Sequence, residues 1–499
     1  MSASRGGRSR DEGRRRDQRS AQAPRDRGRT GDPARRTAYG VMRAISEGAY
    51  ANLELTQQLR RARLGGRDAG FVTELVSGAT RLRGRYDAII AAASSRDLAR
   101  IEPPVLDVLR LGAHQILGMR VPEHAAVGET VALSRAVNGI GASKLVNAVL
   151  RRISERPLEE WVAETVPAEP GVARFAALHS HPEWIVKALR QALLGHGASS
   201  AETVDADLEA LLAADNEAPV VHLVARRGLG AEEDLREAGA EEHPLAATAW
   251  TLGGGDPGRI AAVRDGRAAV QDAGSQLVAL AVAAVPLEGG AAQGEDRWLD
   301  LCAGPGGKAG LLAALAVQTG ADLVANEISE HRAELVASTL ATVREVAGDA
   351  GRTVEVQVGD GREIGAEQPE AFTRVLVDAP CTGLGALRRR PEARWRREQS
   401  DLAGLGPLQR DLLASALDAT APGGVVAYAT CSPHLAETTF VVRDVLKKRD
   451  DVEILDARAY VRDREGSPLE ALGDGPFVQL WPHVHGTDGM FLALLRKRP

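Results

Sequence analysis

The sequence predicts a multi-domain protein in which an N-terminal all-α domain precedes a small α+β region and an α/β domain built on a mostly parallel sheet. Two observations predict this order. From about residue 36 to residue 156, apolar residues recur at helical spacing, and no stretch alternates as a half-buried strand does. From residue 297 onward, short apolar runs alternate with helical segments, which is typical of parallel strands joined by helices on both faces of a sheet.

The chain divides into four segments. Residues 1–35 are rich in Arg, Gly, Asp and Ser and contain almost no large apolar residues, so we expect a disordered basic tail there. The helical domain follows at 36–162, the α+β region at 163–262 and the α/β domain at 263–499. The first 36 residues carry 12 arginines against 5 acidic residues, a charge of +7. Such a tail either keeps the protein soluble or binds phosphates without specificity, and the sequence leaves both alternatives open.

Composition argues against several classes of protein. No apolar stretch reaches the roughly 20 residues that a membrane helix needs, and no secretory signal is evident. The chain has three cysteines in 499 residues, which argues against a disulfide framework. The absence of a CxxC pair, and of histidines paired with the cysteines, argues against a zinc site. We expect a cytoplasmic monomer without a metal and without membrane contact.

Five apolar runs are expected as strands and lead into residues that carry chemistry. The runs are "RWLDLC", "DLVANE", "VEVQVGD", "RVLVDAP" and "GVVAYATC". Ligands of open α/β sheets bind outside the carboxyl ends of the strands. These ends carry Cys302, Asp360, Asp378, Cys381 and Cys431. All three cysteines of the chain are therefore expected on the edge where a ligand binds.

The stretch "DLCAGPGGK" (300–308) predicts a strand-to-helix turn whose glycines let a ligand approach the backbone. It fits neither the GxGxxG nor the GxxxxGK[ST] pattern. Glu327, at the end of the next strand, can accept hydrogen bonds from two ribose hydroxyls, and Asp360 can meet an adenine amino group. A glycine turn and two acids at successive strand ends are the layout of an S-adenosylmethionine pocket. Each feature also has a structural alternative, namely close helix–strand packing for the turn and a loop cap or surface charge for each acid.

Cys381 and Cys431 are candidate nucleophiles. Buried cysteines are usually inert, but both of these follow strands on the ligand edge. The sequence around Cys431 indicates a helix start, and a helix N-terminus lowers the pKa of a thiol. A methyl donor, two thiols and an acid (Asp378) suit methylation of carbon 5 of a pyrimidine, because a thiolate that adds to carbon 6 makes carbon 5 nucleophilic. A carboxyl group at N3 assists the addition, and a base then removes the carbon-5 proton so that the thiol can leave.

The chain resembles the Sun/RsmB-type RNA cytosine-C5 methyltransferases of the Nop/Sun family over about residues 270–497. The resemblance rests on these motifs, in the family's order: "VQDAGSQLVA", "DLCAGPGGK", "NEISEHR", "GDGR", "DAPCTGLGALRRRPEARW", "YATCSPHLAET" and "GTDGMFLALLRK". The helical segment is similar to the NusB-like domain of bacterial members through "AVGETVALSR" and "LVNAVLRRI". The resemblance implies a Rossmann-like class I S-adenosylmethionine-dependent methyltransferase domain, an RNA-binding NusB-like domain, and an α+β region that positions RNA.

The resemblance also implies a role for each site residue. Cys431 is the nucleophile, Cys381 assists product release, and Asp378 contacts the cofactor or the base beside it. The cofactor-binding residues are Cys302, Ala303, Gly304, Pro305, Gly306, Gly307, Lys308, Glu327, Asp360 and Asp378. Six arginines after Cys381 are expected to contact RNA phosphates, unless they form a solvated charged loop: Arg388, Arg389, Arg390, Arg394, Arg396 and Arg397. Glu327 replaces a commoner Asp, and Gly274 a commoner Ala or Ser, without putting the reaction in doubt.

Bacterial members of this domain plan methylate a loop cytosine in small-subunit 16S rRNA, so the resemblance implies that target. Two alternatives remain open. The same chemistry could act on tRNA or 23S rRNA. The chain could also be a non-catalytic RNA-binding assembly or antitermination factor, although the intact glycine turn, acids and thiols argue against this.

Overall fold

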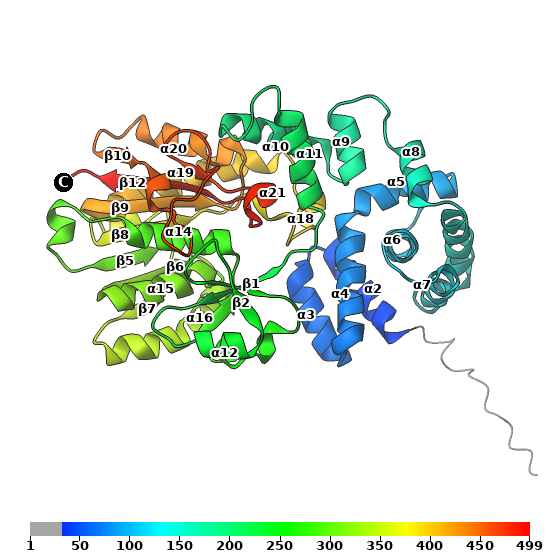
Figure 1. The fold of residues 1–499 in the computed structure, drawn as a ribbon, viewed down its shortest axis with the longest axis horizontal. Coiled ribbons are helices and arrows are strands. Elements are labelled where there is room, and N and C mark those ends of the chain that lie inside the picture. The colour runs from blue at the N-terminus through cyan, green and yellow to red at the C-terminus, as the bar shows by residue number, and fades with distance from the viewer. Residues whose placement is uncertain (1–31) are drawn as a thin grey trace, which may run out of the picture.

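The computed structural model describes residues 32–499, so most of the basic tail expected over 1–35 lies outside the described residues. The end of that expected tail is corrected, because helix α2 (Pro33–Ser46) already begins at Pro33. Asp32 caps this helix by accepting a hydrogen bond from the Arg35 amide. A capping aspartate followed by a proline is a strong signal for a helix start. Figure 1 shows the resulting helical domain beside a larger body that contains both sheets.

The elements of the N-terminal domain are all helical, as the apolar spacing predicted. Helix α6 is buried along most of its length and packs against α7. Helix α7 bends at Gly139, whose φ of 86° lies outside the helical range. The main helices of the domain are α2, α3 (Ala51–Ala62), α4 (Gly66–Arg81), α5 (Arg83–Ser94), α6 (Pro103–Leu117), α7 (Glu123–Ser154) and α8 (Leu158–Thr165).

Three helices lead from this domain into a small sheet. They are α9 (Val172–His179), α10 (Glu183–Gly195) and α11 (Val204–Ala214). The sheet is antiparallel, with the order β2-β3-β1-β4. Its elements are β1 (Val221–Ala225), α12 (Glu232–Glu237), β2 (Ala240–Glu242), β3 (Ala249–Leu252), α13 (Ala261–Arg264) and β4 (Ala268–Val270). Because β4 pairs with β1, the α+β region extends to residue 270, which corrects the boundary expected at residue 262.

The larger sheet has the predicted parallel centre. Its strands are β5 (Arg297–Asp300), β6 (Asp322–Glu327), β7 (Val354–Val358), β8 (Phe372–Asp378), β9 (Thr420–Thr430), β10 (Val452–Leu455), β11 (Val478–Gln479) and β12 (Phe491–Lys497). The order is β10-β12-β9-β8-β5-β6-β7, with β11 paired to β12. Strands β5 to β9 are parallel, and β12 lies antiparallel between β9 and β10. The strand order reverses between β5 and β8, which is the point where such sheets bind ligands.

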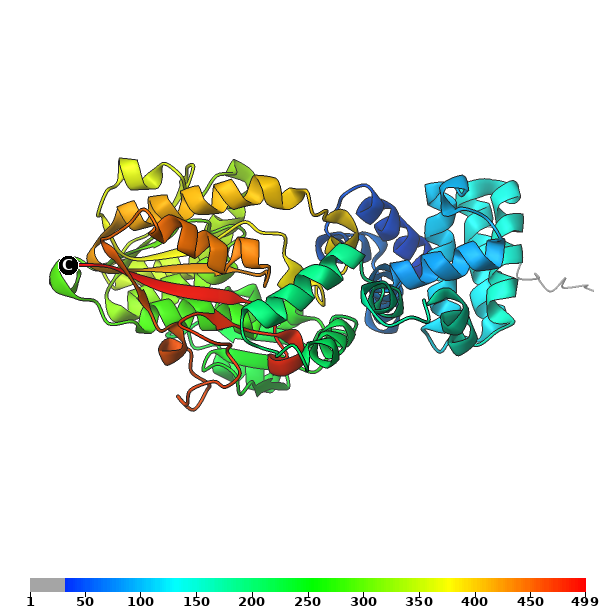
Figure 2. The ribbon, with the colours of Figure 1, turned by 90° about the horizontal axis from the view of Figure 1, so that it is seen from above.

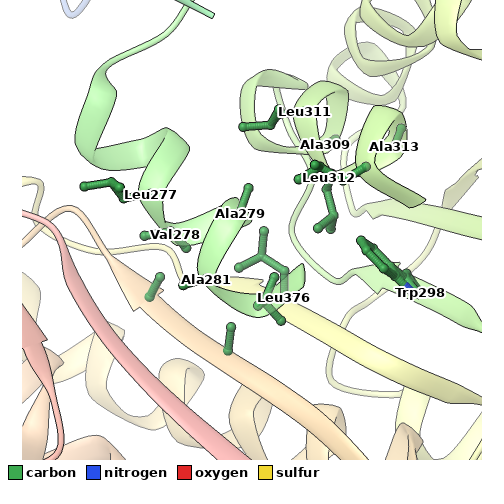
Figure 3. Packing of buried hydrophobic residues seen from close by; sticks show 14 of the residues in the cluster. Leu277, Val278, Ala279, Ala281, Trp298, Ala309, Leu311, Leu312, Ala313 and Leu376 are labelled. Carbon is green, nitrogen blue, oxygen red and sulfur yellow. The ribbon is translucent and has the colours of Figure 1, made fainter. Parts of the chain in front are cut away.

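Helices cover both faces of this sheet. One face carries α14 (Ala273–Ala284), α15 (Gly307–Thr319) and α16 (Glu330–Asp349), and the other carries α17 (Ile364–Glu367), α19 (Asp401–Ala419) and α20 (Thr439–Leu446). Neighbouring residues of β5 divide between the faces, since Trp298 packs in the first core and Leu299 in the second. Figure 3 shows Trp298 and Leu376 beside the apolar side chains of α14 and α15. A strand that is buried on both faces explains the continuous apolar runs of the sequence.

Figure 2 shows the helical domain at one end of an elongated molecule, next to the helices and loops at one side of the large sheet. Two short helices lie in those loops, α18 (Ala393–Arg396) and α21 (Pro482–His485). Across residues 32–499, no helix is both long enough and apolar enough to cross a membrane.

Candidate active site

The carboxyl ends of the parallel strands gather the residues that the sequence singled out. Each of them is the last residue of a strand or lies within three residues beyond one: Cys302 after β5, Glu327 in β6, Asp360 after β7, Asp378 in β8, Cys381 after β8 and Cys431 after β9. The structure therefore brings the glycine turn, both acids and both thiol loops to one edge of the sheet.

The thiols of Cys381 and Cys431 lie in contact, with their sulfur atoms 3.5 Å apart. Strands β8 and β9 are neighbours in the sheet, so the loops that follow them emerge side by side. The hydrogen bond from Cys381 lowers the pKa of Cys431 below that of an ordinary thiol. The same contact, together with burial, raises the pKa of Cys381 well above its ordinary value. Of the two thiols, Cys431 is therefore the one that loses its proton more readily.

A helix N-terminus does not activate Cys431, which corrects the expectation from the sequence. The first helical turn after it, Leu435–Glu437, is a short 3-10 turn, and α20 begins at Thr439. The charges of Arg390 and Lys308 instead add to the effect of the Cys381 hydrogen bond and lower the pKa of Cys431. Burial and the charge of Asp378 act in the opposite direction.

Lys308 and Asp378 form an ion pair beside the thiols. The Lys308 Nζ atom donates to Asp378 Oδ2 at 2.8 Å. Burial disfavours the charge of Lys308, but the Asp378 carboxylate outweighs burial and raises the lysine pKa. Lys308 thus stays protonated at the start of α15, and it holds the Asp378 carboxylate at the edge of the site.

Glu437 is a site residue that the sequence reasoning missed. Its side chain is completely buried. One carboxylate oxygen accepts from the Thr382 amide at 2.8 Å, and the other accepts from the Ser432 hydroxyl at 2.6 Å. Thr382 follows Cys381 and Ser432 follows Cys431, so one carboxylate ties the two thiol loops together. The signal in the sequence was an acid six residues after Cys431, within "TCSPHLAE".

The glycine turn contacts the Glu327 carboxylate. The Gly304 amide donates to Glu327 Oε2 at 3.0 Å, and Arg332 lies 3.2 Å from the same oxygen. A Cβ atom on Gly304 would lie only 2.2 Å from that oxygen, so the close approach needs a glycine. Beyond the next strand, Asp360 pairs with Arg362, which lowers the pKa of the Asp360 carboxyl.

The chemistry of this edge fits S-adenosylmethionine. Ile328, which follows Glu327, and Val358, two residues before Asp360, are apolar yet 63 % and 55 % exposed, and an adenine ring could cover such side chains. A Cβ atom on Gly307 would meet nothing within 4 Å, which leaves open space beside the turn. Burial, and then the charge of Asp378, raises the pKa of Asp300 to about 7. The Cys302 backbone and the charge of Lys308 act in the opposite direction, and the carboxyl itself is buried beneath the turn.

Four of the six arginines expected to contact RNA make contacts within the protein. The expectation is wrong for Arg388 and Arg394, which are buried, whereas Arg389 and Arg396 are partly exposed. Arg394 is completely buried, and its guanidinium donates to backbone and side-chain oxygens. Arg388 is buried and donates to the Gly486 carbonyl at 2.6 Å, while Arg389 forms an ion pair with the buried Asp488. Arg396 donates to a carbonyl of the helical domain.

The two other arginines lie at the mouth of the site. Arg390 is exposed, and its charge lowers the pKa of Cys431. Arg397 is half-buried and reaches the Cys381 carbonyl at 3.4 Å. These two side chains keep the RNA-contact role as a proposal. Within residues 32–499, no group of three or more His, Cys, Asp or Glu side chains is arranged to hold a metal ion.

Replacing Glu437 by Gln should weaken the tie between the thiol loops. We expect a loss of about 1–3 kcal/mol in the free energy of unfolding, because an amide cannot accept all the hydrogen bonds that the carboxylate accepts. The pKa of Cys381 should fall, because the Glu437 charge raises it. Urea unfolding and pH-dependent alkylation measure the two effects, with the exposed Glu355→Gln variant as a matched control. Unchanged stability in Glu437→Gln would contradict the role of this carboxylate.

Comparisons with known proteins show which family the chain belongs to. A family model described as 16S rRNA methyltransferase RsmB/F matches residues 290–496, and the NusB family model matches residues 32–155. The Mycobacterium tuberculosis protein Rv1407, named as a methyltransferase, is 49 % identical over 95 % of this chain and 99 % of its own. The ribosomal RNA small subunit methyltransferase B of Klebsiella pneumoniae is 30 % identical over 87 % of this chain and 91 % of its own.

A solved structure shares the whole architecture. The crystal structure of PH0851 superposes with a TM-score of 0.74 at 20 % identity, and the match covers 93 % of this chain and 98 % of that one. At this identity the likeness shows the fold alone. Together with the sequence relatives, it leads to one conclusion: the chain belongs to the RsmB/F family of S-adenosylmethionine-dependent rRNA methyltransferases and carries a NusB domain at its N-terminus.

Proposed function

We propose that the protein methylates carbon 5 of a cytosine in 16S rRNA by covalent catalysis, with Cys431 as the nucleophile and Cys381 as the residue that assists release. The observation that carries the proposal is the contact between two thiols at the ligand edge of the sheet, in which the pKa of Cys431 is lowered and that of Cys381 is raised. A single thiolate would suffice for addition to the base. A second sulfur at 3.5 Å supports a separate later step.

In the proposed reaction the Cys431 thiolate forms a bond to carbon 6, and the electrons of the carbon 5–carbon 6 double bond move toward carbon 5. Asp378, which lies beside Lys308, would meet the N3 edge of the base and, once it carries a proton, would donate it to N3 as negative charge develops there. S-adenosylmethionine, held by the glycine turn, Glu327 and Asp360, supplies the methyl group. Removal of the carbon-5 proton then re-forms the double bond and expels Cys431 as a thiolate.

The structure suggests how Cys381 changes role between these steps. While Cys431 is a thiolate, its hydrogen bond and charge raise the pKa of Cys381 and keep that thiol protonated. Once Cys431 is bonded to the base it carries no charge, so that effect disappears and Cys381 loses its proton more readily. Cys381 can then act as a base, or assist one, next to the adduct.

The choice of 16S rRNA is supported by the family description and by the Klebsiella relative, whose name states a small-subunit ribosomal RNA target. A ribosomal RNA target would place the protein in the cytoplasm. The intact pair of thiols and the fit of the cofactor edge count against a non-catalytic assembly factor.

Replacing Cys431 by Ala and replacing Cys381 by Ala should block two different steps of the reaction. Cys431→Ala should abolish methyl transfer and covalent attachment to RNA, because no nucleophile remains. Cys381→Ala should still attack the base but release it poorly, so a covalent protein–RNA species should appear as a shifted band on a denaturing gel. The exposed Glu355→Gln variant, which keeps all three thiols, is the control for a substitution outside the site. Full activity of Cys431→Ala would overturn the mechanism.

Replacing Lys308 by Met should move the acid limb of the kcat/KM profile to higher pH. The reaction needs the Cys431 thiolate, so kcat/KM falls as the pH drops through the pKa of that thiol. The charge of Lys308 lowers the pKa of Cys431, and the charge of Asp378 raises it. Loss of the lysine should therefore raise this pKa, because the lowering charge is gone and the Asp378 charge is no longer balanced by it. The exposed Lys447→Met variant should keep the original profile. An acid limb that stays in place would show that Lys308 does not activate Cys431.

Loss of the protein should remove a 5-methylcytosine from 16S rRNA. Bisulfite sequencing of rRNA and tRNA from a strain without the gene would locate the lost mark, and complementation with the wild-type chain, but not with Cys431→Ala, should restore it. A mark lost from tRNA or 23S rRNA alone would reject the 16S target and keep the chemistry.

A further inference from the structure

The segment that follows Cys381 connects the active site to the NusB domain. We propose that residues 388–397 are a latch through which the docked NusB domain holds the Cys381 loop in the position needed for release of the methylated base. The inference rests on the proposed function, because the release role of Cys381 is part of that proposal.

Both ends of the latch are held close to the thiol loops. Arg389 forms an ion pair with Asp488, whose side chain is almost completely buried. The Gly385 amide, just before the latch, donates to the Cys431 carbonyl at 2.9 Å. At the other end of the segment, Arg397 returns to the Cys381 carbonyl at 3.4 Å. The segment therefore leaves the active site and comes back to it.

The middle of the latch is buried between domains. The Arg394 guanidinium donates to the carbonyl of Arg81, the last residue of α4, at 3.1 Å. It also donates to the Asp215 carbonyl at 2.5 Å and to the Asn216 side chain at 2.7 Å, just after α11. Burial lowers the pKa of Arg394 only to about 10, so the side chain stays charged near neutral pH. A buried guanidinium is costly unless it is hydrogen-bonded, and these oxygens meet that need.

The neighbours of Arg394 continue the contact into the NusB domain. The Trp395 indole donates to the Thr80 carbonyl at 2.9 Å. Its ring lies so close to Gly84 that a Cβ atom there would approach a ring carbon to 2.6 Å. Arg396 donates to the Ala49 carbonyl at 2.6 Å. Figure 1 shows α18, which carries these side chains, in the region where the helical domain meets the larger body.

The two thiols depend on the latch to different degrees. Cys431 directly follows β9, so the sheet itself fixes its backbone. Cys381 lies three residues beyond β8, on a loop that runs on into the latch. Loosening the latch should therefore displace Cys381 more than Cys431. The expected defect is slow release of the adduct, and attack on the base should be spared.

The first test measures adduct release in the full-length protein with a 16S rRNA transcript. Arg394→Ala and Arg396→Ala should each lower the rate of adduct resolution about tenfold, because catalysis is sensitive to misplacement by an ångström. Methyl transfer in a single turnover should stay within about twofold of wild type. Arg394→Lys, which keeps the charge but not the forked geometry, should give an intermediate rate. Arg190→Ala, which removes an exposed ion pair on α10, should behave as wild type.

The second test does not depend on the chemistry of release. In a Cys431→Ser background, iodoacetamide should alkylate Cys381 about tenfold faster when Arg394 or Arg396 is replaced by Ala, because local opening controls access. Cys302 in the same molecule is the internal reference, and its alkylation rate should not change. Arg396 is only half-buried, so Arg396→Ala remains informative if Arg394→Ala fails to fold.

The outcomes separate the latch from the proposed function. If Cys381→Ala accumulates the adduct and the latch variants do not, the latch is overturned and the proposed function stands. If Cys381→Ala accumulates no adduct, the release role fails, and the alkylation rates decide whether the latch holds the loop. Faster alkylation of Cys302 and Cys381 alike would overturn the latch in favour of global loosening. Weaker RNA binding with unchanged Cys381 reactivity would overturn it in favour of direct RNA contacts.

Discussion

The buried carboxylate of Glu437 is the interaction on which the active site depends. Neighbouring strands bring two loops to the same edge, but strand spacing alone, about 4.8 Å, does not fix a contact between two side chains. The Thr382 amide and the Ser432 hydroxyl share one carboxylate, so the backbone next to each thiol has a defined position. The Glu437 charge also raises the pKa of Cys381, while Arg390 and Lys308 lower that of Cys431. One buried charge thus helps both to place the thiols and to divide their roles.

At the domain junction, too, one part of the chain makes more than one kind of contact. A run of arginines next to Cys381 suggests an RNA-binding loop, yet Arg394 is bonded to carbonyl and amide oxygens inside the protein. These contacts join the NusB domain to the segment that follows Cys381. Arg390 is exposed and Arg397 half-buried, so these two remain open to a ligand. One short segment of the chain therefore carries both domain contacts and exposed charge.

Most of the fold was predictable because its signals are local. Helical spacing predicted the N-terminal domain, and apolar runs bounded by Gly, Pro or Asp predicted the five parallel strands. The features that the sequence did not predict depend on pairing between segments that lie far apart in the chain. Strand β4 belongs to the smaller sheet only because it pairs with β1, and β12 joins the larger sheet by lying between β9 and β10. The prediction of a helix start at Cys431 was wrong, because a cysteine followed by Ser-Pro is also compatible with a loop.

The sequence by itself determined the fold class, the edge where the chemistry lies and the identity of the two thiols, because strand ends and turn residues are set by short-range patterns. Only the tertiary structure decided which groups shift the pKa of each thiol, that Glu437 joins the two loops, and that Arg388 and Arg394 are buried in the protein. Those properties depend on burial and on the charges that folding brings within a few ångströms. Residues far apart in the chain supply them, as Lys308 and Arg390 do for Cys431.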